Sequence, residues 1–143
     1  MLKKLNFQYL FSYFGLIPYF YILINKYFFF EIKEEIFINF LIYYTLFILV
    51  FIGSLNWNLE KKLKFHIVFY GFLPSIFAVI ITTLNLYNFN VLKIFISLIF
   101  FLIFQLFLDY FLIYSKKTIK SSYYLLRLPL TIAIIIILVL IIF

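Results

Sequence analysis

Apolar and polar residues follow one another along this chain in long blocks. Five apolar runs, separated by short polar breaks, each approach the roughly 20 residues that an α-helix needs to cross a hydrocarbon core. A strand at the same depth would leave backbone N–H and C=O groups unpaired in lipid, so every run is predicted to be a helix. The predicted spans are residues 7–25, 36–55, 64–85, 91–114 and 125–143.

Composition favours lipid as the main solvent of these helices. The chain has 143 residues, is 68% hydrophobic and has a mean hydropathy of +1.19. Soluble domains average about 45–50% apolar residues, and a small soluble domain exposes too much surface to hide many more. The sequence therefore predicts an all-α integral membrane bundle of five transmembrane helices, organised as a single domain over residues 1–143. It contains no cysteine, which excludes disulfides and thiolate metal sites.

The positive charges predict an orientation for this bundle. If the chain crosses five times, nine Lys and Arg residues lie on one side and three on the other, and the richer side is normally cytoplasmic. The N-terminus is therefore expected in the cytoplasm and the C-terminus outside. We attribute the net charge of +7 to this bias and expect no nucleic-acid partner. The richer side carries Lys3, Lys4, Lys61, Lys62, Lys64, Lys116, Lys117, Lys120 and Arg127, and the other carries Lys26, Lys33 and Lys93.

All glycines and prolines lie inside the predicted spans. A proline removes a helical hydrogen bond and bends its helix, so several spans are expected to be kinked. A glycine lets a neighbouring helix approach closely. The expected kinks and close contacts are at Gly15 and Pro18 in the first span, Gly53 in the second, Gly71 and Pro74 in the third, and Pro129 in the fifth.

Five short motifs occur in a characteristic order: GLIPYF, FIGSLNW, YGFLPS, LFLDY and SYYLLRLPLT. This order, which covers nearly the whole chain, resembles domain-of-unknown-function family 3429, which includes the mitochondrial transmembrane protein 69. The resemblance implies the helical membrane fold and a bacterial inner (plasma) membrane, or alternatively the mitochondrial inner membrane, and it implies no reaction. Asn56 and Asn58 replace a histidine and a glycine of the family motif, so no histidine-based metal or proton site is expected there.

Asp109 is a carboxylate within the fourth apolar run. A charge at such a depth costs about 2.5–3.5 kcal/mol on insertion scales and normally faces protein or water. Arg127 is expected at a similar depth in the fifth span, and Gln105 one turn away from Asp109 on the same face. We favour a structural ion pair that joins the two spans. The alternatives are a carboxylate that handles protons or cations, and a contact with another membrane protein.

A second candidate site follows the second span, where Asn56, Trp57 and Asn58 form an interfacial cluster. These residues could bind a lipid headgroup or cap a shallow cavity. The simpler interpretation, which we favour, is a helix end with an interfacial tryptophan anchor. His66 is the only histidine and has no second ligand at metal-binding spacing, so no metal is expected.

No phosphate loop, zinc motif or Ser-His-Asp set is present, so no catalytic residue and no cofactor are predicted. We expect a non-enzymatic structural or assembly component of a membrane complex. The alternative is a small oligomeric transporter, or a protein that conducts protons or ions through Asp109. A lipid-acting enzyme is the least favoured hypothesis. The expected partners are the bilayer and other membrane proteins or further copies of the chain.

Overall fold

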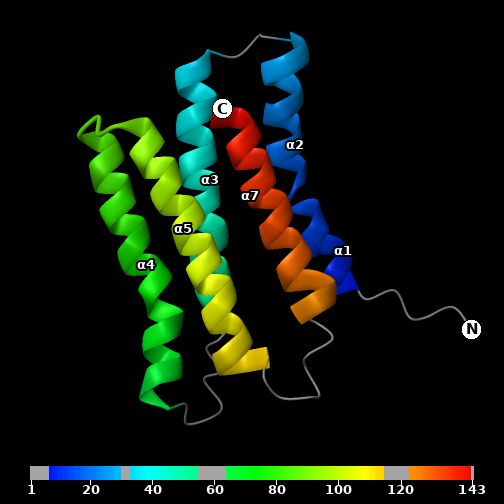
Figure 1. The fold of residues 1–143 in the computed structure, drawn as a ribbon, viewed down its shortest axis with the longest axis vertical. Coiled ribbons are helices and arrows are strands. Elements are labelled where there is room, and N and C mark those ends of the chain that lie inside the picture. The colour runs from blue at the N-terminus through cyan, green and yellow to red at the C-terminus, as the bar shows by residue number, and fades with distance from the viewer. Residues whose placement is uncertain (1–6, 30–32, 55–63, 115–122, 143) are drawn as a thin grey trace, which may run out of the picture. The chain divides into compact units, whose positions relative to one another are not determined.

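A computed structural model describes residues 7–29, 33–54, 64–114 and 123–142. These residues are helical apart from short turns, and they contain no strand. Three short π-helical segments, Asn25–Phe29, Tyr110–Tyr114 and Tyr123–Arg127, extend the helices that they adjoin. The helices in Figure 1 are α1 (Phe7–Phe14), α2 (Ile17–Ile24), α3 (Glu34–Ser54), α4 (Phe65–Leu86), α5 (Val91–Asp109) and α7 (Leu128–Ile142).

Four helices of the described residues are long and apolar enough to cross a membrane. Their bounds agree with the second to fifth predicted spans to within two residues at each end, because apolar runs between polar breaks define both. The prediction of an all-helical membrane protein is therefore confirmed at this level. The four helices are Glu34–Ser54, Phe65–Leu86, Val91–Leu112 and Tyr123–Ile142.

The first predicted span, 7–25, is wrong as one continuous helix. Helix α1 ends at Phe14, the chain turns at Gly15 and Leu16, and α2 begins at Ile17. Pro18 lies in the first turn of α2, where its missing N–H would have had no helical acceptor. It starts a new helix instead of kinking an existing one. Helix length alone therefore does not confirm five crossings.

The described chain separates into two compact units, which we treat individually. The first combines residues 1–33 with residues 102–143, and the second comprises residues 34–101. The second half of α5 thus belongs to the first unit and the first half to the second. The single-domain organisation remains a prediction.

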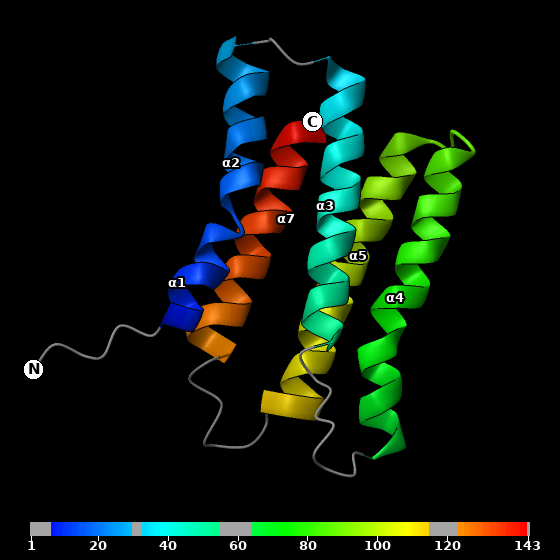
Figure 2. The ribbon, with the colours of Figure 1, turned by 180° about the vertical axis from the view of Figure 1, so that it is seen from behind.

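In the first unit, α2 and α7 lie side by side and run in the same direction (Figures 1 and 2). The parallel alignment is fixed by pairs of residues at both ends. Tyr13, in α1, bonds to the carbonyl of Leu125, and Tyr27 bonds to the carbonyl of Leu140. Tyr19 of α2 is fully buried.

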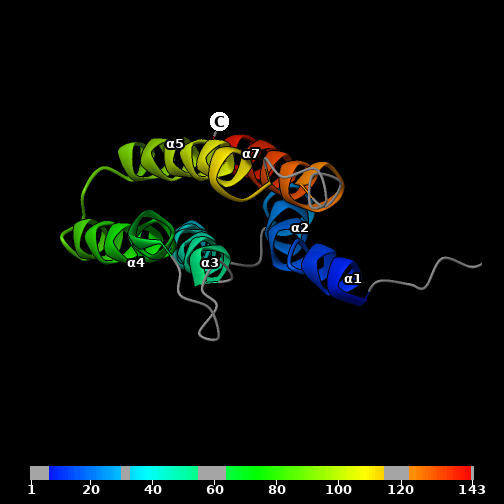
Figure 3. The ribbon, with the colours of Figure 1, turned by 90° about the horizontal axis from the view of Figure 1, so that it is seen from below.

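In the second unit, α3 and α4 pack side by side, as the end-on view in Figure 3 shows, and run in opposite directions (Figures 1 and 2). A Cβ atom on Gly53 would lie 2.7 Å from the carbonyl oxygen of Gly71 and 2.8 Å from Cγ of Pro74. Only a glycine fits at this crossing, as the sequence predicted for Gly53. Pro74 lies within α4, which continues through it.

A short turn joins α4 to α5 in the same unit. Asn88 adopts a left-handed backbone conformation with φ of 54°, which asparagine tolerates better than most residues. Asn90 then accepts a bond at its side-chain oxygen from the N–H of Lys93, 3.3 Å away, and so caps the start of α5. The stretch between α4 and α5 carries no charge. It separates the two helices because Asn88 turns the chain and Asn90 starts the next helix.

Candidate functional sites in the two units

The first candidate site is the ion pair of Asp109 and Arg127. Asp109 is the last residue of α5, and Arg127 ends the π-helical turn that leads into α7. Nε of Arg127 donates to Oδ2 of Asp109. Both residues are buried, with 2% and 7% of their surface exposed. The pair joins the end of α5 to the start of the C-terminal helix, and its depth in a membrane remains a prediction.

Further polar side chains surround this pair. Nη1 of Arg127 donates to Oγ1 of Thr131 at 3.3 Å, and the Thr131 hydroxyl donates to the Arg127 carbonyl at 2.9 Å. Gln105 is buried one turn before Asp109 in α5. We call Asp109, Arg127, Thr131 and Gln105 the Asp109 cluster. Thr131 was not among the predicted residues, although its position one turn after Arg127 places both on the same helix face.

Tyr123 extends the contact between α5 and the start of the C-terminal helix. Its hydroxyl donates to the carbonyl of Leu106 at 3.2 Å, and its ring lies 5.2 Å, centroid to centroid, from that of Tyr110. Tyr123 was not among the site residues predicted from the sequence. An aromatic ring with a polar end suits a position beside a buried ion pair, because it packs well and still provides a hydrogen bond.

The chemistry of the Asp109 cluster is that of a fixed contact. Nε of Arg127 binds one oxygen of the Asp109 carboxylate, Oδ2, and Nη1 of the same guanidinium binds Thr131. Removing one partner of a buried pair typically costs about 3–5 kcal/mol, because the remaining charge is buried alone. The cluster therefore connects helices strongly while leaving Asp109 already engaged.

Tyr13 compensates for the proline in the C-terminal helix. Leu125 lies in the π-helical turn that leads into α7, and an α-helical bond to its carbonyl would need the N–H of residue 129, which Pro129 lacks. The Tyr13 hydroxyl donates to this carbonyl, that of Leu125, at 2.6 Å. The contact joins the N-terminal segment to α7 at the point where the proline weakens the backbone bonding.

The other end of α7 receives similar support. The last carbonyls of a helix have no partner within it. Nζ of Lys26 donates to the carbonyl of Ile141, and the Tyr27 hydroxyl donates to that of Leu140 at 2.7 Å. The lysine charge also suits the negative end of the helix dipole. Lys26 thus has a structural role, in addition to being one of the positive charges counted in the orientation prediction.

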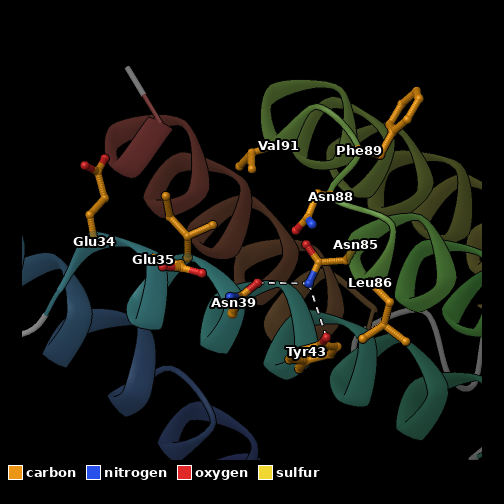
Figure 4. Close-up of a pocket in the computed structure, with 10 residues that line it drawn as sticks. Glu34, Glu35, Asn39, Tyr43, Asn85, Leu86, Asn88, Phe89 and Val91 are labelled. Atoms are coloured by element: carbon orange, nitrogen blue, oxygen red, sulfur yellow. Dashed lines mark hydrogen bonds between the residues drawn. The ribbon is translucent and has the colours of Figure 1, made fainter.

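The second candidate site is a pocket of about 700 Å³ in the unit formed by residues 34–101. We call it the α3–α4 pocket. It lies where α3 begins, α4 ends and α5 begins, and Figure 4 shows its polar and apolar side chains together. The residues that line it are Glu34, Glu35, Ile38, Asn39, Tyr43, Asn85, Leu86, Asn88, Phe89 and Val91.

A hydrogen-bonded set of side chains joins the two helices inside this pocket. Nδ2 of Asn85 donates to Oδ1 of Asn39 at 2.9 Å and to the Tyr43 hydroxyl at 3.2 Å (Figure 4). None of these three residues was among the site residues predicted from the sequence. The available signal was Asn39, an amide inside an apolar run of otherwise membrane-compatible residues.

The remaining predicted residues fall elsewhere. Asn56, Trp57 and Asn58 lie outside the described residues, so the interfacial cluster remains a prediction. His66 is exposed in the first turn of α4. Within the ranges that the structure describes, no group of three or more His, Cys, Asp or Glu residues could hold a metal ion.

Comparisons of the chain with protein-family models, with curated proteins and with solved structures found no match. The resemblance to family 3429 therefore stays a prediction. The function of the chain has to be inferred from the Asp109 cluster and the α3–α4 pocket themselves.

Proposed function

We propose that this chain is a five-crossing membrane protein that acts without catalysis, as a structural or assembly component of a larger membrane complex. The observation that supports this most is the engagement of Asp109. Its carboxylate is buried against Arg127, and Arg127 is in turn bonded to Thr131. The most conspicuous charged group within a span therefore serves to join helices.

The parallel direction of the N-terminal segment and α7 supports five crossings. Successive spans alternate in direction, so a first and a fifth span run the same way, whereas a first and a fourth run oppositely. Tyr13 and Tyr27 contact Leu125 and Leu140 in the same order along both segments. Residues 7–29, although broken at Gly15, have enough length to cross, roughly 33 Å at 1.5 Å per residue.

The distribution of lysine and arginine supports the orientation that accompanies five crossings. We propose a cytoplasmic N-terminus, an external C-terminus and a bacterial inner membrane, with the mitochondrial inner membrane as the alternative. The three residues on the poorer side are all among those that the structure describes. Two of them, Lys26 and Lys93, contact aromatic rings close to helix ends, at 5.6 Å from Tyr27 and 5.7 Å from Phe89.

A further observation favours a structural role over transport. A carrier carboxylate has to exchange its partner for water or a cation during each cycle, which would require breaking a buried contact with Arg127. A transporter that uses Asp109 is the competing hypothesis, and it predicts a different result in the experiment below.

The experiment is co-purification of the tagged full-length chain from membranes in a mild detergent. The wild type is compared with the double variant Asp109→Asn/Arg127→Gln, which removes both charges, keeps the shape of the aspartate side chain and replaces the guanidinium with a shorter amide. A structural role predicts a stoichiometric partner protein with both chains, because the double variant leaves no unpaired charge. A wild-type chain that purifies alone would contradict assembly into a larger complex. Loss of ion flux into liposomes in the folded double variant would then assign transport to Asp109.

A further inference from the structure

The α3–α4 pocket lies at one end of two helices that are long and apolar enough to cross a membrane. Glu34 and Glu35 occupy the first turn of α3, and Asn39 lies roughly 8 Å further along the helix at 1.5 Å per residue. Asn85 is the penultimate residue of α4. The pocket thus extends from the ends of these helices to one or two turns inside them. In a helix that crosses a bilayer, this is the region in which polar headgroups meet hydrocarbon.

The polar lining combines negative charge with oriented amides. Glu34 and Glu35 contribute two carboxylates, and both are exposed to an incoming molecule. The two bonds within the pocket use the side-chain nitrogen Nδ2 of Asn85. The side-chain oxygen Oδ1 of the same amide is a further acceptor. The Tyr43 hydroxyl oxygen accepts the bond from Asn85, and its hydrogen takes no part in that bond. A cation with several N–H donors matches this arrangement better than an anion does.

The apolar lining fits a molecule that also carries hydrocarbon. Leu86 is 70% exposed and Phe89 is 44% exposed, and both line the pocket. Lys93 lies with its ammonium 5.7 Å from the centre of the Phe89 ring, on the surface of the same unit. A positive charge next to Phe89 suits the phosphate of a zwitterionic headgroup whose ammonium enters the pocket.

A structural explanation for the two glutamates is incomplete. Acidic residues in the first turn of α3 stabilise the helix through its dipole. This accounts for their sequence position, but not for a cavity lined jointly by the glutamates and a bonded set of amide and phenol groups from two helices.

We propose that the α3–α4 pocket binds a primary ammonium group, carried by an aminophospholipid headgroup or by a free phosphorylated amine. The acceptors that the lining offers to the ammonium are the carboxylates of Glu34 and Glu35 and the side-chain oxygen Oδ1 of Asn85. This site is separate from the Asp109 cluster and does not depend on the proposed assembly function.

The test is native mass spectrometry of the full-length chain in a non-ionic detergent, with added phosphatidylethanolamine, phosphatidylcholine or phosphatidylglycerol of matched acyl chains. Phosphatidylcholine keeps the positive charge but has no N–H donors, and phosphatidylglycerol has no cation. The variant is Glu34→Gln/Glu35→Gln. The control is Asn90→Ser, which lies outside the lining and retains a helix-capping side chain. Melting temperatures without lipid establish that each variant is folded.

We expect the wild type and the control to bind phosphatidylethanolamine about tenfold more tightly than phosphatidylglycerol, the equivalent of two exposed ion pairs of somewhat under 1 kcal/mol each. Phosphatidylcholine should bind more weakly than phosphatidylethanolamine, and the double variant should lose the preference. Equal binding of phosphatidylethanolamine and phosphatidylglycerol by the wild type would overturn the proposal. An unchanged preference for phosphatidylethanolamine in the double variant would also overturn it. Competition by soluble phosphoethanolamine identifies a free amine as the ligand, and its failure to compete identifies the lipid.

Discussion

Removal of one charge from the Asp109 cluster should destabilise the protein more than removal of both. Asp109→Asn leaves the guanidinium of Arg127 buried without its carboxylate, at a position where only 7% of the residue is exposed. Arg127→Gln leaves the carboxylate of Asp109 buried without its guanidinium. The double variant leaves an amide pair without net charge. The expected order of stability is therefore wild type, then the double variant, then the two single variants.

The burial of the pair determines the size of the effect. Exposed ion pairs contribute about 0–1 kcal/mol, but Asp109 is 2% exposed, so the values for buried pairs apply. For Asp109→Asn we expect a loss of about 3–5 kcal/mol in the free energy of unfolding. For the double variant we expect a loss of roughly 1–2 kcal/mol, corresponding to altered hydrogen bonds without an isolated charge.

The assay is unfolding of the purified chain in mixed micelles of a mild detergent and an increasing fraction of dodecyl sulfate, followed by circular dichroism and tyrosine fluorescence. The four proteins form a double-mutant cycle, which isolates the interaction between the two side chains. Thr131→Val serves as a matched control, because it removes a neutral partner of Arg127 and no charge.

Two results would refute this reasoning. One is a loss below about 1 kcal/mol in both single variants, which would assign the pair to the class of exposed ion pairs. The other is a double variant whose loss equals the sum of the single losses. Additivity would mean that the two side chains do not interact in the membrane, and the structural role of the cluster would then be wrong.

Three further predictions concern packing, the proline and topology. Gly53→Ala should lower stability by about 1–3 kcal/mol in the same assay, because its Cβ would overlap the carbonyl of Gly71 in the neighbouring helix, and an unchanged stability would contradict the close crossing. Tyr13→Phe should lower the free energy of unfolding by about 1 kcal/mol in the wild type, but by close to nothing in a Pro129→Ala background, where a backbone N–H is restored that can bond to the same carbonyl. Equal losses in both backgrounds would contradict the proposal that Tyr13 compensates for the proline. A reporter fused after Phe143 should be active only on the non-cytoplasmic side, and cytoplasmic activity would exclude the proposed five crossings with an N-terminus in the cytoplasm.

The sequence predicted those features that depend on position along one helix. Run lengths determined the bounds of α3, α4 and α5, and the depths of Asp109 and Arg127 within their runs predicted that they could meet. Both inferences need only a rise per residue and the thickness of the membrane. The break at Gly15 was recognised as a weak point but was predicted as a kink. A glycine followed by Pro18 allows either outcome, and contacts elsewhere decide between them.

Features that depend on which helices are neighbours could not be predicted. Asn39 and Asn85 are separated by 46 positions in the chain, and each alone resembles a polar residue near the end of a span. Their meeting depends on the antiparallel packing of α3 against α4 and on the rotation of both helices, which hydropathy does not encode. The contact of Tyr13 with Leu125, 112 positions away, was hidden for the same reason.

The long separation of the contacts in the first unit has a consequence for biosynthesis. Ribosomes add roughly 5–20 residues per second, so Asp109 is made about 1–4 s before Arg127, which lies 18 positions later. Tyr13 precedes Leu125 by 112 positions and waits about 6–22 s at the same rate. Residues 34–101 can pair during this interval, whereas the first unit cannot close until α7 has entered the bilayer. The contacts that Tyr13 and Asp109 make with the C-terminal helix therefore form last, after every other helix of the chain has been made.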